Sequence, residues 1–117
     1  MAWFDGLPLK DVALPVTVVD EILFGLLTMP QGRKRDEKLA RFGRLLSLVE
    51  VWPIDRDAAE RSADLRAQRQ LAGRNLSLGD SQIGGLALSR GARVASRDTY
   101  VFDWPGVVAI DPWAGGA

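Results

Sequence analysis

The sequence contains no cysteine and no histidine among its 117 residues. Without cysteine, disulfides and thiolate nucleophiles are excluded, and without either residue the usual zinc sites are excluded as well. Every Ser-His-Asp or Cys-His mechanism is also ruled out, because these mechanisms need an imidazole base. Acid–base chemistry at neutral pH is therefore left to carboxylates, to lysine or to water acidified by a metal ion.

Net charge and long apolar segments are lacking too. Fifteen Lys and Arg residues balance fifteen Asp and Glu residues, so the total charge indicates no particular partner. No apolar run approaches the roughly 20 residues of a membrane-spanning helix, and the N-terminus lacks the basic-then-apolar order of a secretory signal. We therefore expect no membrane association and a cytoplasmic protein. The length suits one domain with a real core.

Short apolar runs alternate with amphipathic stretches along the chain. The runs predict strands at 12–16, 49–54, 93–96 and 107–110. Helical spacing predicts helices at 18–29, 33–48, 57–72 and 77–90, and residues 1–6 read as the end of another helix. Predicted helix caps are Thr17, Asp55 or Asp57, and Ser77. This alternation indicates an α/β domain with a mostly parallel sheet. We expect it to cover residues 1–113, with 114–117 as a flexible tail.

Three acids stand near the ends of these elements. We place Glu21 in the first turn of one helix and Asp80 at the start of another, while Asp98 follows a predicted strand. Ligands of open α/β sheets bind outside the carboxyl ends of the strands. Carboxylates gathered from separate elements form a site for a hard cation such as Mg²⁺ or Mn²⁺. The pattern therefore predicts metal-assisted phosphodiester chemistry.

Each of these acids also has an ordinary structural interpretation. Asp80 could simply cap its helix, although Ser77 is already a good cap. Asp98 could be a turn residue. Glu21 is flanked by apolar residues on a helix that should face the sheet, and a buried glutamate is costly unless it is paired or metal-bound. Ser96 could orient a ligand or water, or be a neutral residue at the end of a strand.

Two helices carry further patterns. Basic residues crowd the polar side of the predicted helix 33–48, and they could form a solvated face or contact RNA phosphates. The candidate RNA-binding residues are Arg33, Lys34, Arg35 and Lys38, with Arg41 and Arg44 further along. Alanines in the predicted helix 57–72 indicate close helix packing; these are Ala58, Ala59, Ala63 and Ala67.

The order of these segments resembles the PIN-domain ribonucleases, and among them the VapC-type toxins of bacterial toxin–antitoxin pairs. The segment 17–25 resembles the family's Thr-x-x-x-Glu-Leu-x-x-Gly motif and aligns its glutamate with Glu21. Gly79-Asp80-Ser81-Gln82-Ile83 resembles the family's Asp-x-x-Ile-Ala-Ala helix, and Val94-Ala95-Ser96-Arg97-Asp98 resembles its Val-Thr-Arg-(Asn/Asp) motif. Asp111-Pro112-Trp113 resembles a frequent family ending.

The resemblance implies a PIN-like three-layer fold with a mostly parallel sheet flanked by helices. It implies a Mg²⁺-dependent endoribonuclease toxin that acts in plasmid or genome stability. Catalysis and metal binding would use Glu21, Asp80 and Asp98, with Ser96 in support. The implied partners are an antitoxin protein, an RNA substrate and a second copy of the chain in a homodimer.

The chain also departs from the family pattern. Nothing matches the family's first, central strand with its Leu-Asp-Thr-Asn-like segment, and Asp5 is a poor substitute for that strand's aspartate. We therefore expect the first strand to be missing. Gly84 and Gly85 replace small helix formers, at a cost of up to about 1 kcal/mol each relative to Ala. One alternative is an inactive PIN-fold relic that at most binds an antitoxin. Another is a generic α/β module whose acids are all caps.

Overall fold

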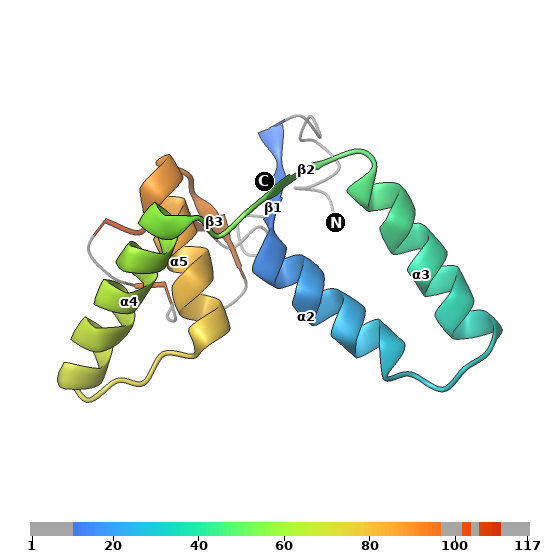
Figure 1. Cartoon of the computed structure of the whole chain (residues 1–117), viewed down its shortest axis with the longest axis horizontal. Helices are drawn as coiled ribbons and strands as arrows, with labels where there is room; N and C mark the ends of the chain where they lie inside the picture. Colours follow the sequence, from blue (N-terminus) through green and yellow to red (C-terminus); the bar gives the residue numbers. More distant parts are fainter. Residues whose placement is uncertain (1–10, 97–101, 104–105, 111–117) are drawn as a thin grey trace. The chain divides into compact units, whose positions relative to one another are not determined.

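The structure is a computed structural model that describes residues 11–96, 102, 103 and 106–110 (Figure 1). The chain divides into two compact units, one within Pro8–Pro53 and the other containing Ile54–Ala117. The expected single domain over 1–113 with a tail at 114–117 stays a prediction.

The first unit is a pair of parallel strands connected through two helices. Strand β1 (Ala13–Pro15) leads directly into helix α2 (Val16–Leu27), and helix α3 (Arg33–Leu46) leads to strand β2 (Glu50–Trp52). The strands pair in parallel, with Leu14 opposite Val51. Pro30 and Gly32 lie in the loop that joins the two helices, which leaves the strand pair at the far ends of α2 and α3 (Figure 1). These elements agree with the prediction to within three residues at each end.

The start of α2 differs from the prediction. Pro15 is the residue that precedes the helix, no side chain caps it, and Thr17 lies inside the first turn. Pro15 has φ −60° and ψ 141°, and the helix begins at the next residue, Val16, which is two positions earlier than a Thr17 cap implies. The predicted Thr17 cap is therefore wrong.

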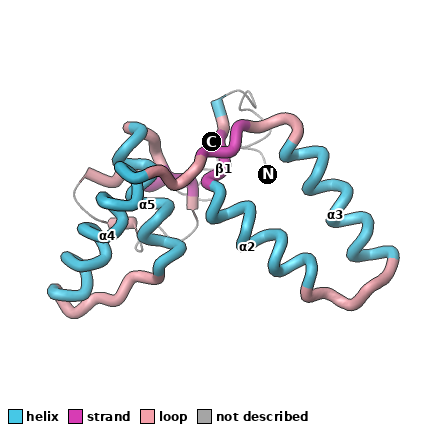
Figure 2. The backbone as a smooth tube through the Cα atoms, viewed as in Figure 1, coloured by secondary structure: helices cyan, strands magenta, loops and turns pink. Residues whose placement is uncertain are grey.

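The second unit is built on two helices that lie side by side, α4 (Arg56–Leu71) and α5 (Leu78–Arg90) (Figures 1 and 2). Asp55 caps α4, because its Oδ1 accepts a hydrogen bond of 2.9 Å from the N–H of Ala58. Gly91 ends α5 in the left-handed conformation at φ 63°, which glycine adopts without steric cost. Both boundaries were predictable from the residue types.

Strands β3 (Val94–Ala95) and β4 (Ala109–Ile110) form a second parallel pair, with Val94 opposite Ala109. Buried Val94 packs with Ala87 of α5 and with Phe102, and the half-buried Ile83 and Val107 cover this cluster. This apolar cluster therefore joins α5 to β3 and to the segments that carry Phe102 and Val107.

The predicted α/β class with parallel strands is confirmed. Within the described residues the strands form two separate two-stranded sheets, β1–β2 and β3–β4, and most described residues are helical (Figure 2). The predicted helix end at 1–6 lies outside the described residues. The absence of a first central strand also stays a prediction.

The predicted alanine packing is only partly correct. Ala58 is fully buried, but Ala59, Ala63 and Ala67 are exposed. The buried face of α4 instead runs through Ala58, Ser62, Leu65 and Arg69, which recur every three or four residues. A serine and an arginine thus occupy positions where the sequence suggested alanines.

Candidate functional site

Asp80 lies in the first turn of α5 and is half-buried. It does not cap its helix through its side chain. Ser77 is the cap, because its Oγ accepts a hydrogen bond of 3.1 Å from the backbone N–H of Asp80. The carboxylate of Asp80 is therefore not used for capping, and it stands where the helix dipole favours negative charge.

The turn that carries Asp80 is anchored to α4 by two buried hydroxyl groups. Ser81 Oγ donates to the carbonyl oxygen of Leu78 at 2.7 Å, and Ser62 Oγ donates to Ser81 Oγ at 3.1 Å. Ser81 is fully buried and Ser62 is 3% exposed. Since buried polar groups are costly unless paired, this chain of bonds fixes the start of α5 against α4.

Two glycines of α5 allow the helices to approach closely. A Cβ atom on Gly85 would lie 2.6 Å from the carbonyl oxygen of Ala58 and 2.6 Å from the backbone nitrogen of Ser62. A Cβ atom on Gly84 would lie 2.8 Å from Cδ2 of Leu65. Gly85, which looked like a costly departure in the sequence, is therefore required by the contact with the α4 backbone, whereas a Cβ atom at Gly84 would need only the end of the Leu65 side chain to shift.

Glu21 is placed differently from the prediction. It lies in the second turn of α2, because the helix begins at Val16, and no acid occupies the first turn. Glu21 is exposed, so the expected burial is wrong, and the argument that a buried glutamate needs a cation does not apply. The assignment of Glu21 as a metal ligand therefore rests only on the sequence motif at 17–25.

The third expected ligand, Asp98, lies outside the described residues. Ser96 is described: it follows β3 directly and is half-buried. Its position at the carboxyl end of a parallel strand matches the place where such sheets bind ligands. The supporting role of Ser96 stays a prediction.

The donor chemistry of the predicted site fits a hard divalent cation. Glu21, Asp80 and Asp98 offer only carboxylate oxygens, the ligands that Mg²⁺ and Mn²⁺ prefer. Glu21 belongs to the first compact unit and Asp80 to the second. Within the part of the chain that the structure describes, no group of three or more acidic, His or Cys side chains is gathered as a metal site. The ligand set therefore stays a prediction.

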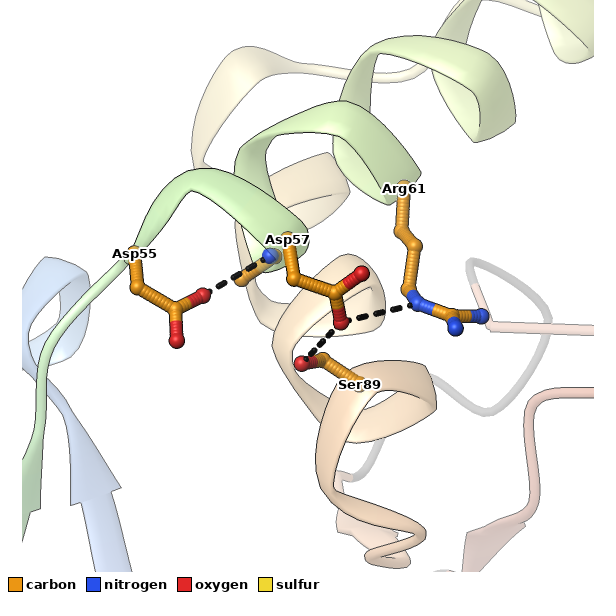
Figure 3. Close-up of polar contacts among 5 residues, drawn as sticks. Asp55, Asp57, Arg61 and Ser89 are labelled. Atoms are coloured by element: carbon orange, nitrogen blue, oxygen red, sulfur yellow. Dashed lines mark hydrogen bonds and ion pairs between the residues drawn. The ribbon is translucent and has the colours of Figure 1, made fainter.

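A cluster that the sequence analysis missed lies at the other end of the α4–α5 contact (Figure 3). Ser89 Oγ donates to Asp57 Oδ2 at 2.6 Å, and Arg61 Nε donates to the same oxygen at 3.1 Å. The hydrogen bond from Ser89, and then that from Arg61, holds the pKa of the Asp57 carboxyl below its usual value. The spacing of Asp57 and Arg61 signalled their pairing, but no local signal predicts a contact with Ser89.

The basic residues of α3 separate into different environments. Arg33 Nε pairs with Glu37 Oε1 at 3.0 Å, and both side chains are exposed. Arg35 is half-buried, and Lys34 and Lys38 are exposed. The four candidate RNA-binding residues are therefore not equivalent.

Comparisons with known proteins identify the family. A family model described as "PIN domain" matches residues 1–103. VapC ribonuclease Y4jK of Sinorhizobium fredii is 35% identical over 116 residues, which cover 97% of this chain and 83% of that protein. The crystal structure of FitAcB from Neisseria gonorrhoeae matches with a TM-score of 0.88 and 30% identity, covering 96% of this chain and 83% of that chain.

A further solved structure is described as VapBC-5, a member of the VapBC family of toxin–antitoxin systems, from Mycobacterium tuberculosis. It matches with a TM-score of 0.74 and 29% identity, covering 85% of this chain and 80% of that chain. The family model and the relatives extend over most of the chain and agree with one another. The chain belongs to the PIN-domain family and, within it, to the VapC-type toxins.

Proposed function

We propose that this chain is the toxin of a type II toxin–antitoxin pair and acts as a Mg²⁺- or Mn²⁺-dependent endoribonuclease. The observation that carries the proposal is the placement of Asp80. Its carboxylate is not used as a cap, is half-buried, and stands on a turn that Ser77, Ser81 and Ser62 hold in place. A ligand carboxylate needs such a fixed position, because loosely held groups bind and orient poorly.

Glu21, Asp80 and Asp98 are the proposed metal-binding and catalytic residues, and Ser96 the proposed supporting residue. The cation would supply positive charge at the scissile phosphate and would acidify a water molecule. The carboxylates would hold that cation and orient the phosphate. Ser96, at the end of β3, would hold a water or a phosphate oxygen by hydrogen bonding.

The proposed substrate is RNA, as the name of the Sinorhizobium fredii relative suggests. The basic helix α3 supports this, because phosphate contacts need several Lys and Arg side chains and no base-specific ones. Arg33, Lys34, Arg35 and Lys38 are the basic residues proposed from the sequence. Cellular RNA would be met in the cytoplasm, which is the proposed location. Among the described helices, none combines the length and the hydrophobicity that a membrane-spanning segment needs.

The proposed protein partner is an antitoxin whose apolar segment docks on α2. Ile22, Phe24 and Leu27 are 38%, 69% and 53% exposed, a concentration of apolar surface that suits a partner peptide. The toxin–antitoxin description of the Mycobacterium tuberculosis structure supports the same partner. Pairing of two copies in a homodimer is proposed as well, and light scattering of the purified protein would measure it.

The test is RNA cleavage by the purified protein with Mg²⁺ and with EDTA. Cleavage should need the metal, and Asp80→Asn should abolish it, because the amide keeps the shape of the side chain but removes its charge. Asp20→Asn, a change of one exposed acid beside Glu21 on α2, is the matched control and should leave cleavage unchanged. If the folded protein binds an antitoxin but cleaves no RNA, the enzyme proposal is rejected in favour of the inactive PIN-fold relic.

A further inference from the structure

Positive charge is concentrated on one helix of this neutral chain. Helix α3 carries six basic residues against two acidic ones, a net charge of +4. Because the whole chain sums to zero, the remaining residues carry a net charge of −4. A basic helix on an otherwise acidic molecule is an electrostatic footprint for a polyanion.

The six basic residues do not share one face. With 3.6 residues per turn, Arg35 falls in line with Leu39, Phe42 and Leu46, which form the inward face of α3. Phe42 is buried, and the other three are half-buried. The aliphatic stem of the Arg35 side chain therefore packs along this face.

A second face carries Arg33 and Arg44, and the charge of Arg33 is already neutralised. The exposed Arg33 pairs with Glu37 one turn later, at 3.0 Å. An RNA phosphate that engaged Arg33 would have to compete with this carboxylate. Arg33 is therefore a weak candidate, although it opens the basic run in the sequence.

Lys34, Lys38 and Arg41 form a third face, which we name the α3 basic stripe. They are one turn apart along α3, and all three side chains are exposed. Among the described residues, none of the three takes part in an ion pair or side-chain hydrogen bond. The stripe extends about 10 Å along the helix, from the 1.5 Å rise per residue. Within the described part of the chain, it is a row of three cations with no ion-pair partner.

We infer that the α3 basic stripe binds the sugar–phosphate backbone of RNA, independently of base sequence. The inference rests on the proposed function for its substrate class. Contact with bases by stacking needs an exposed aromatic ring, but the aromatic residue of α3, Phe42, is only 7% exposed. The stripe offers charge without a stacking surface, which suits phosphates. The stripe keeps Lys34 and Lys38 of the four RNA-binding residues predicted from the sequence. It leaves out Arg33 and Arg35 and includes Arg41.

The experiment measures binding of a labelled single-stranded RNA oligonucleotide in EDTA, so that cleavage cannot contribute. The affinity is followed as a function of salt concentration. Each phosphate contact on single-stranded RNA contributes about 0.7 to the slope of log affinity against log salt. The double variant Lys38→Gln/Arg41→Gln should therefore lower the slope by about 1.4. Glutamine favours helix, so α3 should stay folded, and circular dichroism checks this.

The matched control is Arg56→Gln/Arg93→Gln, which removes the same charge. Both arginines are exposed and lie outside α3, and Arg56 is paired with Glu60. The control should change the slope by much less than the stripe variant. The inference is overturned if the two variants have equal slopes of log affinity against log salt, or if the slope of the stripe variant equals that of the wild type. Binding of an acidic peptide to the stripe would not change that conclusion.

Cleavage in Mg²⁺ is measured separately with the same proteins. If cleavage needs the metal but the salt dependence of RNA binding is the same in the wild type and the stripe variant, the proposed function stands and the inference is rejected. A stripe-dependent slope with no metal-dependent cleavage would reject the proposed enzyme and keep the RNA-binding surface.

Discussion

Gly85 of α5 lies directly against the backbone of Ser62 of α4. A Cβ atom at Gly85 would be 2.6 Å from the backbone nitrogen of Ser62 and 2.8 Å from its Cα. Backbone atoms cannot move aside as the end of a flexible side chain can. This contact sets how closely α5 approaches α4, and so it also sets the position of the turn that carries Asp80.

The first prediction is that Gly85→Ala destabilises the protein. Alanine favours helix over glycine by up to about 1 kcal/mol, but forcing a methyl group into a closed contact costs about 1–3 kcal/mol. We expect a lower urea midpoint. Gly43→Ala in α3 is the control, because a Cβ atom there meets nothing within 4 Å and should stabilise α3. Stabilisation by both changes would mean that the helices are not in such close contact.

The sequence predicted the second unit well, because its boundaries are encoded locally. Asp55 and Ser77 are good capping residues and both cap their helices. Gly91 ends α5 as expected. What failed was the packing of α4, where Ala63 is exposed and Ser62 is buried. Burial of a serine depends on a partner 19 positions away, Ser81, and no local pattern indicates that pairing.

The candidate site was less predictable than the fold. Asp80 was correctly predicted at the start of α5. The alternative that Asp80 caps this helix is wrong, because Ser77 is the capping residue. Glu21 was predicted in the first turn and lies in the second, because the helix begins at Val16, two residues earlier than predicted. Whether carboxylates from different elements meet is a tertiary question, and Asp98 lies outside the described residues.

The second prediction concerns the buried hydroxyl pair. Ser81→Ala leaves Ser62 without its acceptor in a buried position, which should cost about 1–3 kcal/mol of unfolding free energy. Ser62→Ala should cost less, about 0.5–1.5 kcal/mol, because Ser81 keeps its bond to Leu78. A double-mutant cycle by urea unfolding measures the coupling. Strictly additive losses would show that the two hydroxyls do not interact.

The third prediction concerns the pH dependence of the α4–α5 contact. The bonds from Ser89 and Arg61 lower the pKa of Asp57 in the folded protein below the ordinary value of 3.8. The contribution of Asp57 to stability is therefore fully present above that ordinary value and is lost as the pH falls through the lowered pKa. Ser89→Ala removes the largest cause, so the Asp57 pKa should rise and the stability should depend less on pH in this acid range.

Carbon NMR of the Asp57 carboxyl group measures that pKa directly, and urea unfolding at neutral and acid pH measures the stability. Asp64→Asn is the control. Asp64 Oδ2 accepts a hydrogen bond of 2.8 Å from Gln68 Nε2 of the same helix, and Asp64 does not bridge to α5. An Asp57 titration that is the same with and without Ser89 would show that the hydrogen bond does not hold the carboxylate in solution.

The last prediction is that Asp80→Asn and Glu21→Gln each weaken Mn²⁺ binding, measured by calorimetry with no RNA present. A hard cation binds carboxylate oxygens because of their charge, and each amide removes one charge with little change in shape. Asp80→Asn should have the larger effect, because Asp80 is half-buried on an anchored turn while Glu21 is exposed. Asp20→Asn, one residue before Glu21, is the control for a change of exposed charge on α2. If wild type and both ligand variants bind Mn²⁺ equally, these acids do not form the metal site, and Asp80 would then be an ordinary residue in a rigid turn.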